Sequence, residues 1–124
     1  MKTILIVDDE QNIRESIVDF LTEIGFNVLT ANNGMEGLQR ARDFHPELIL
    51  CDIDMPLVNG YTMMVALQLD DKTKDIPIIV ITGKQDKSEI GNVKLLGAED
   101  CITKPFSLER LRSAIALHIH ENFA

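Results

Sequence analysis

Residues 3–9 read TILIVDD, and this stretch decides the fold. Its first five residues form a short, β-branched apolar run without polar alternation, which is typical of a strand buried on both faces. The run ends at two adjacent carboxylates, Asp8 and Asp9. Residues 47–51 (ELILC) repeat the pattern and are followed by Asp52. Both stretches predict buried parallel strands that end in acidic side chains.

Strand-like runs alternate with amphipathic helical segments along the whole chain. Apolar residues such as Ile13, Ile17 and Ile24 recur at helical spacing, which places them on one face of a helix. We expect strands at residues 3–7, 27–31, 47–51, 77–81 and 100–103. We expect helices around residues 13–24, 33–44, 61–69 and 88–96. A final helix is expected after the capping residue Ser107, with Leu108, Leu111, Ile115 and Ile119 on its inner face.

Five strand-then-helix repeats predict an α/β fold. Strands joined by helical crossovers run parallel, and right-handed crossovers place helices on both faces of the sheet. The expected architecture is a doubly wound sandwich around a five-stranded parallel sheet. Ligands of such sheets bind beyond the carboxyl ends of the strands, so the functional residues are expected at that edge.

Length and composition exclude several classes of protein. The 124 residues predict a single domain over residues 1–124, and a net charge of −8 argues against binding to a nucleic-acid backbone. No apolar run approaches the roughly 20 residues of a membrane helix, and the first residues do not resemble a signal peptide. Cys51 and Cys101 lie in apolar runs, which favours buried free thiols in a reducing compartment. We therefore expect a cytoplasmic protein.

Side chains that carry chemistry follow four of the expected strands. They are Asp8, Asp9, Asp52, Asp54, Thr82 and Lys104. Crowded carboxylates repel one another, and a hard divalent cation with oxygen ligands, such as Mg²⁺, offsets that repulsion. A carboxylate is also a nucleophile toward phosphorus, and the transferring phosphoryl group needs nearby positive charge. The set therefore indicates Mg²⁺-dependent phosphoryl transfer to an aspartate.

Four segments resemble the signature segments of the response-regulator receiver domain. They are residues 4–9 (ILIVDD), 48–56 (LILCDIDMP), 79–83 (IIVITG) and 102–106 (ITKPF), in the order and spacing of that family. The resemblance covers essentially the whole chain. It implies a flavodoxin-like (βα)5 sandwich with strand order 2-1-3-4-5, an order for which a chemotaxis receiver is a known example.

The resemblance also implies roles for the residues at the strand ends. Asp52 would be the phosphoacceptor and a magnesium ligand, and Asp9 would hold Mg²⁺ with Asp8 ligating directly or through water. Asp54 would offer its backbone carbonyl to the metal. Lys104 would contact the phosphoryl oxygen, and its bond to Pro105 would be cis. The switch residue Thr82 would move toward the phosphoryl group on activation.

The family further implies partners for the chain. The phosphoryl group would come from a sensor histidine kinase or a histidine phosphotransfer protein. A downstream protein would bind the face formed by the fourth helix, fifth strand and fifth helix, and the same face allows a homodimer. No direct contact with nucleic acid or membrane is expected.

One position departs from the family pattern, and two further residues are expected to set the lifetime of the phosphorylated state. Cys101 stands three residues before Lys104, where many members carry a switching Tyr or Phe, and a thiol is too small for that aromatic coupling. Asp54 and Lys84 lie two residues after Asp52 and Thr82, respectively. Because their charges are opposite, the two side chains are expected to pair across the mouth of the site and to obstruct the hydrolytic water. This pairing would lengthen the lifetime of the phosphorylated state.

Two other functions stay open at this point. Asp52 and Asp54 after an apolar strand also resemble the nucleophile and acid pair of haloacid-dehalogenase-type phosphatases. That family normally opens its core with this strand and needs a longer chain. The second alternative is a docking module that is never phosphorylated, against which the complete acidic set and Lys104 argue.

Overall fold

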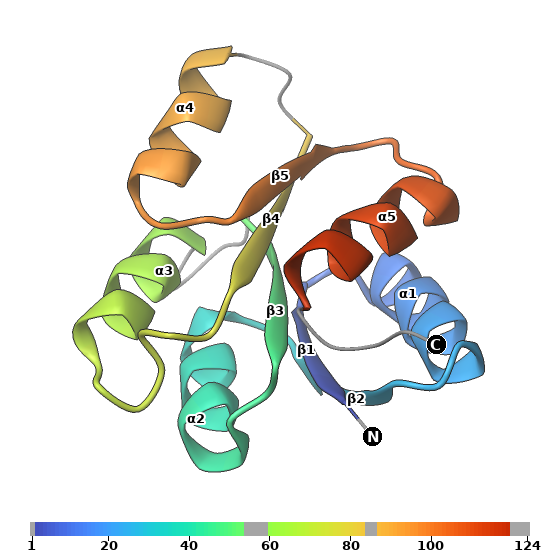
Figure 1. The fold of residues 1–124 in the computed structure, drawn as a ribbon, viewed down its shortest axis with the longest axis horizontal. Coiled ribbons are helices and arrows are strands. Elements are labelled where there is room, and N and C mark those ends of the chain that lie inside the picture. Colours follow the sequence, from blue (N-terminus) through green and yellow to red (C-terminus); the bar gives the residue numbers. More distant parts are fainter. Residues whose placement is uncertain (1, 54–59, 84–86, 120–124) are drawn as a thin grey trace.

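The computed structural model describes residues 2–53, 60–83 and 87–119. Within them, strands and helices alternate as the sequence predicts (Figure 1). The strands are β1 Thr3–Val7, β2 Asn27–Ala31, β3 Leu48–Asp52, β4 Ile78–Thr82 and β5 Asp100–Thr103. The helices are α1 Gln11–Glu23, α2 Gly34–Phe44, α3 Gly60–Leu69, α4 Lys87–Leu95 and α5 Leu108–His118.

The sheet is parallel throughout, and its strand order β2-β1-β3-β4-β5 confirms the predicted flavodoxin-like topology. Helices α1 and α5 cover one face, while α2, α3 and α4 cover the other (Figure 1). The central strands β1 and β3 lie side by side, with Val7 opposite Cys51. Their carboxyl ends therefore meet at one edge of the sheet.

Alternating side chains of the strands fill two separate cores, one on each face of the sheet. In β1, Ile4 and Ile6 pack under α1 and α5, whereas Leu5 and Val7 pack under α2 and α3. Because both faces are covered by helices, the strand is apolar at every position rather than at every second one. This burial explains why the sequence shows continuous apolar runs.

Helix ends follow the capping chemistry that the sequence indicates. The Asn33 side chain accepts a hydrogen bond from the Glu36 N–H at 2.9 Å, and the Ser107 side chain accepts one from the Arg110 N–H at 3.0 Å. Both contacts satisfy backbone donors that the first turn of a helix leaves without an intrahelical partner. No helix of the described residues is long and apolar enough to cross a membrane.

Two sequence-based expectations about burial are wrong. Leu108 was expected on the inner face of α5, yet it is 43% exposed because it begins the helix and lines a surface groove with Ile13 and Phe106. Ala114 packs in the core instead. Cys101 is only half-buried, because β5 is an edge strand with a single neighbour, β4.

We expect Gly60→Ala to lower the free energy of unfolding by about 1–3 kcal/mol. An added Cβ would lie 2.6 Å from the Ile53 Cα and 2.9 Å from the Asp52 carbonyl oxygen, so the start of α3 would have to move away from the end of β3. Urea unfolding monitored by circular dichroism measures the change.

Gly91→Ala is the matched control, because a Cβ at that position in α4 meets nothing within 4 Å. It should be neutral or stabilising by up to about 1 kcal/mol, since alanine is the better helix former. Equal unfolding midpoints for the two variants would contradict the close approach at Gly60.

Candidate functional site

Three carboxylates gather where β1 and β3 end. Asp8 and Asp9 follow β1, and Asp52 is the last residue of β3. Each offers one oxygen, and these three oxygens lie within 4.8 Å of one another. The structure thus confirms the predicted acidic cluster for these residues. The fourth predicted member, Asp54, lies outside the described residues.

Asp8 is the most constrained of the three carboxylates. Its side chain is buried, and its Oδ1 accepts a hydrogen bond from the Glu10 N–H at 2.8 Å. Its Oδ2 is also buried but has no hydrogen-bond partner among the described residues. Buried polar atoms are normally paired, so this oxygen indicates a missing positive partner.

The protonation of Asp8 reflects this position. Burial raises the pKa of Asp8 from 3.8 to about 6. This net value includes a smaller decrease from the hydrogen bond of the Glu10 N–H and a smaller increase from the charge of Asp52. A hard cation bound beside the three carboxyl groups would favour the ionised form of Asp8.

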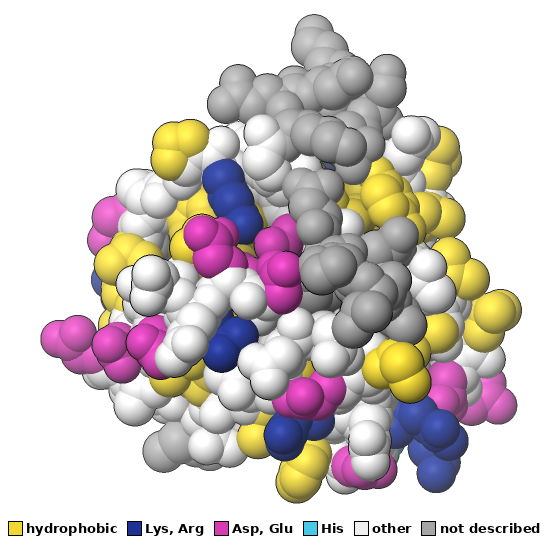
Figure 2. Space-filling view, turned by 180° about the vertical axis from the view of Figure 1, so that it is seen from behind, with side chains coloured by type: hydrophobic (Ala, Val, Ile, Leu, Met, Phe, Trp, Pro, Cys, Tyr) yellow, Lys and Arg dark blue, Asp and Glu magenta, His cyan; other side chains and the backbone are white. Residues whose placement is uncertain are grey.

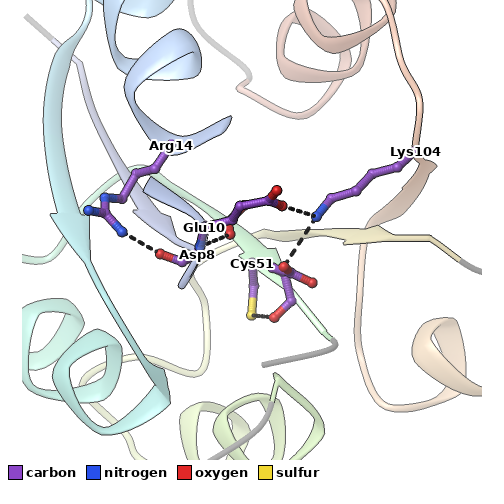
Figure 3. Close-up of polar contacts among 6 residues, drawn as sticks. Asp8, Glu10, Arg14, Cys51 and Lys104 are labelled. Carbon is purple, nitrogen blue, oxygen red and sulfur yellow. Dashed lines mark hydrogen bonds and ion pairs between the residues drawn. The ribbon is translucent and has the colours of Figure 1, made fainter. Parts of the chain in front are cut away.

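Lys104 brings an ammonium group to the carboxylates from the segment after β5. Its Nζ lies 3.2 Å from Asp52 Oδ2 and 3.9 Å from Glu10 Oε2 (Figure 3). Burial alone would lower the pKa of Lys104, but the charges of Asp52, Asp8 and Glu10 outweigh that effect and raise it. Lys104 therefore stays charged at neutral pH.

The backbone also fixes Lys104 in place. Its N–H donates to the Thr82 carbonyl at 2.7 Å, and the peptide bond to Pro105 is cis, as the family resemblance implies. Thr82 is the buried last residue of β4, in register with Thr103 of β5. The predicted hydroxyl and ammonium groups thus come from adjacent strand ends.

The two cysteines occupy different environments. The buried Cys51 thiol donates a weak hydrogen bond to the Asp52 carbonyl at 3.4 Å. Burial raises the pKa of the Cys51 thiol, and the charges of Asp52 and Asp8 raise it further, so it remains a neutral thiol rather than a nucleophile. Cys101 is paired with Val80 in the sheet and packs against the core under α3 and α4.

Sequence reasoning missed two residues of the site, Glu10 and Arg14. The Arg14 guanidinium donates to the Asp8 backbone carbonyl at 2.7 Å, on the opposite side of Asp8 from Lys104 (Figure 3). The Glu10 carboxylate approaches Lys104. Both are charged residues near the start of a helix, and in a sequence such residues are typical of a solvent-exposed helix face rather than of a functional site. The remaining lifetime candidate, Lys84, lies outside the described residues.

A groove of about 520 Å³ lies beside Lys104, between α1 and the start of α5. Figure 2 shows hydrophobic surface next to acidic side chains and a basic one on a single face of the molecule. The groove is lined mainly by apolar side chains, namely Ile13, Ile17, Pro105, Phe106 and Leu108, and also by Asn12 and Ser16. An apolar groove next to reactive groups is a favourable binding surface for another protein.

Known proteins resemble this chain in sequence and in fold. Residues 4–116 match a protein family described as the response regulator receiver domain. Protein PilG of Pseudomonas aeruginosa is 31% identical over 116 residues, which cover 94% of this chain and 86% of PilG. Response regulator RR06 of Streptococcus pneumoniae is 39% identical over 105 residues, 85% of this chain and 47% of RR06, so the chain spans less than half of that relative. The structure of chemotaxis protein CheY4 of Vibrio cholerae has a TM-score of 0.90 at 29% identity and covers 95% of this chain and 98% of CheY4.

We expect Asp8→Asn to stabilise the metal-free protein at neutral pH by on the order of 2 kcal/mol. The folded protein holds the Asp8 proton more tightly than the unfolded chain does, because folding raises its pKa from 3.8 to about 6. Stability of the wild type should therefore fall as pH rises through that interval and stay low above it. Asparagine keeps an oxygen for the Glu10 N–H and removes the charge.

Denaturant unfolding in a chelator, at several values between about pH 4 and pH 8, measures this dependence. The exposed Asp43, at the end of α2, provides the control Asp43→Asn, which should follow the wild-type curve. If Asp8→Asn loses as much stability as the wild type across the interval, burial of the Asp8 charge is not the cause.

Proposed function

This chain belongs to the response regulator receiver domain family of two-component and chemotaxis signalling, and on that basis we propose that Asp52 accepts a phosphoryl group and thereby switches the protein. The observation that carries the proposal is the setting of Asp52. Asp52 is 4% exposed, and its carboxylate lies 3.2 Å from the Lys104 ammonium and shares its edge of the sheet with Asp8 and Asp9. A nucleophilic carboxylate, an ammonium group for the phosphoryl oxygens and a cluster of carboxylates that could bind a metal ion thus lie close together.

The proposed reaction is a direct transfer from phosphohistidine on a sensor kinase or phosphotransfer protein. An ionised oxygen of Asp52 attacks the phosphorus, and an O–P bond forms as the P–N bond to the donor imidazole breaks. The electron pair returns to the imidazole nitrogen, which takes up a proton from water. Lys104 then pairs with an oxygen of the transferred phosphoryl group and stabilises its charge.

The acidic cluster fits Mg²⁺. Asp8, Asp9 and Asp52 supply three converging oxygens, and the buried Asp8 Oδ2 has no partner among the described residues. These residues would hold the ion, with the Asp54 backbone carbonyl as a further ligand. When bound, Mg²⁺ supplies positive charge to the phosphoryl oxygens and offsets the repulsion among the carboxylates. Asp8 gains most from it, because its burial opposes ionisation.

Switching is proposed to run from Thr82 to the surface of α4, β5 and α5. The Thr82 hydroxyl would move toward the phosphoryl group, and the small, half-buried Cys101 would not fill the vacated space as an aromatic ring would. Leu95 and Leu117 are 86% and 67% exposed on that surface, which suits a downstream protein or a second copy of the chain. This signalling is proposed to take place in the cytoplasm. Asp54 and Lys84 are proposed to set the lifetime of the phosphorylated state.

The groove beside Lys104 is the proposed docking surface for the phosphodonor protein. A donor must bring its phosphoryl group to Asp52, so the contacts that hold it have to surround the mouth of the site. The groove is the described apolar surface that also includes Lys104, the cation bound to Asp52. Apolar contact there would add affinity without adding charge to an already acidic site.

Acetyl phosphate with Mg²⁺ should add one phosphoryl group to the wild type and none to Asp52→Asn. Intact-mass spectrometry under mild conditions measures the addition. Asp43→Asn, which changes an exposed carboxylate far from the strand ends, should be labelled as the wild type is. Unchanged labelling of Asp52→Asn would move the site to another residue. Sustained turnover of a generic phosphomonoester by the wild type would instead indicate a phosphatase.

Leu108→Asn should slow phosphotransfer from a cognate phosphorylated kinase at least tenfold and leave labelling by acetyl phosphate within twofold, as expected for about 1.4 kcal/mol or more of lost docking energy. The control is Leu117→Asn, an exposed position on the same helix that does not line the groove. Rapid-quench measurements with both donors separate docking from chemistry. Equal slowing of both variants would show that the donor protein does not dock in the groove.

A further inference from the structure

Glu10 places a carboxylate at the mouth of the site. Neither helix capping nor the cluster of Asp8, Asp9 and Asp52 explains the position of this carboxylate. It occupies the N-cap position of α1, yet its side chain makes no capping hydrogen bond. Its side chain is 59% exposed and reaches to 3.9 Å from the Lys104 ammonium (Figure 3). The three oxygens that converge for a metal come from Asp8, Asp9 and Asp52 instead.

The contact with Lys104 is too weak to account for this position by itself. Lys104 lies closer to Asp52, at 3.2 Å, than to Glu10, at 3.9 Å. An ion pair of that length with a mostly exposed member contributes little to stability. Any larger effect of Glu10 must therefore come from the negative charge that it adds at the mouth of the site, where a phosphodonor enters.

Glu10 decides the sign of that charge. The cluster of Asp8, Asp9 and Asp52 carries three negative charges, which one divalent cation and Lys104 together balance. Glu10 adds a further negative charge on the solvent side, so the charges of the described residues and one divalent cation sum to a negative value with Glu10 and to zero without it. Arg14 does not alter this balance at the mouth, because it binds the Asp8 backbone carbonyl on the side away from Lys104 (Figure 3).

We propose that Glu10 is a specificity-determining residue that selects the phosphodonor by charge, disfavouring small dianionic acyl phosphates relative to less negative donors with a P–N bond, such as phosphohistidine. The inference rests on the proposed phosphorylation of Asp52. A small donor has little besides charge to hold it, so repulsion by an exposed carboxylate acts on it in full. A protein donor gains apolar contacts in the groove and depends less on that charge.

The test compares phosphorylation rates of Glu10→Gln and the wild type at saturating Mg²⁺ and low ionic strength. With acetyl phosphate, a dianion at neutral pH, Glu10→Gln should react about threefold faster. With phosphoramidate, which carries about one negative charge at neutral pH, the gain should be smaller because the repulsion scales with donor charge. The gain should vanish near 1 M salt, where the screening length is about 3 Å.

Two variants control for shape and for total charge. Glu10→Asp keeps the charge and should retain the slow reaction of the wild type with acetyl phosphate. Glu23→Gln removes a charge from the exposed far end of α1 and should react as the wild type does. Calorimetric titration of Mg²⁺ into each variant, as a separate readout, should show weaker binding in Glu10→Gln than in Glu23→Gln, because only Glu10 lies near the cluster.

An unchanged or slower reaction of Glu10→Gln with acetyl phosphate, or an equal gain with both donors at every salt concentration, would overturn the role of Glu10. In either case the wild type would still be phosphorylated at Asp52. Absence of any Mg²⁺-dependent phosphorylation of the wild type would instead overturn the proposed function, so the two failures are distinguishable.

Discussion

The buried, unpartnered Oδ2 of Asp8 is the constraint on which the rest of the site depends. Parallel strands β1 and β3 lie side by side, so the residues that follow their carboxyl ends are forced together. Asp8 cannot turn to solvent, because its other oxygen is held by the Glu10 N–H and Arg14 binds its backbone carbonyl. The fold thus stores a repulsion among carboxylates that a cation would relieve. Lys104 relieves part of it by binding Asp52.

The same constraint connects the site to the surfaces around it. Lys104 is held by the backbone of β4 and reaches across to Asp52, so any change in the charge of Asp52 acts on the segment between β5 and α5. That segment borders the apolar groove on one side and leads into α5 on the other. A charge change of this kind biases a two-state equilibrium only through contacts that differ between the states. Thr82, Lys104 and Glu10 are the described side chains placed to make such contacts.

Much of the fold and of the acidic cluster could be predicted because both follow from local rules. Continuous apolar runs such as residues 3–7 indicate strands buried on both faces, and the topology of parallel strands then brings Asp8, Asp9 and Asp52 together. The exposure of Leu108 could not be predicted, because helical spacing does not say where the sheet ends beneath a helix. Glu10 and Arg14 were missed because their roles depend on side-chain directions across the β1–α1 turn, which no periodicity encodes.

The most direct test of this charge-balance account is the number of protons released when Mg²⁺ binds. Calorimetric titrations at one pH, in buffers of different ionisation enthalpy, measure that number. Burial raises the pKa of Asp8 to about 6, so the account predicts release of about half a proton per ion at about pH 6 and almost none at about pH 8. Loss of the release at about pH 6 in Asp8→Asn would identify its source. Mg²⁺ binding without proton release at about pH 6 in the wild type would contradict the account.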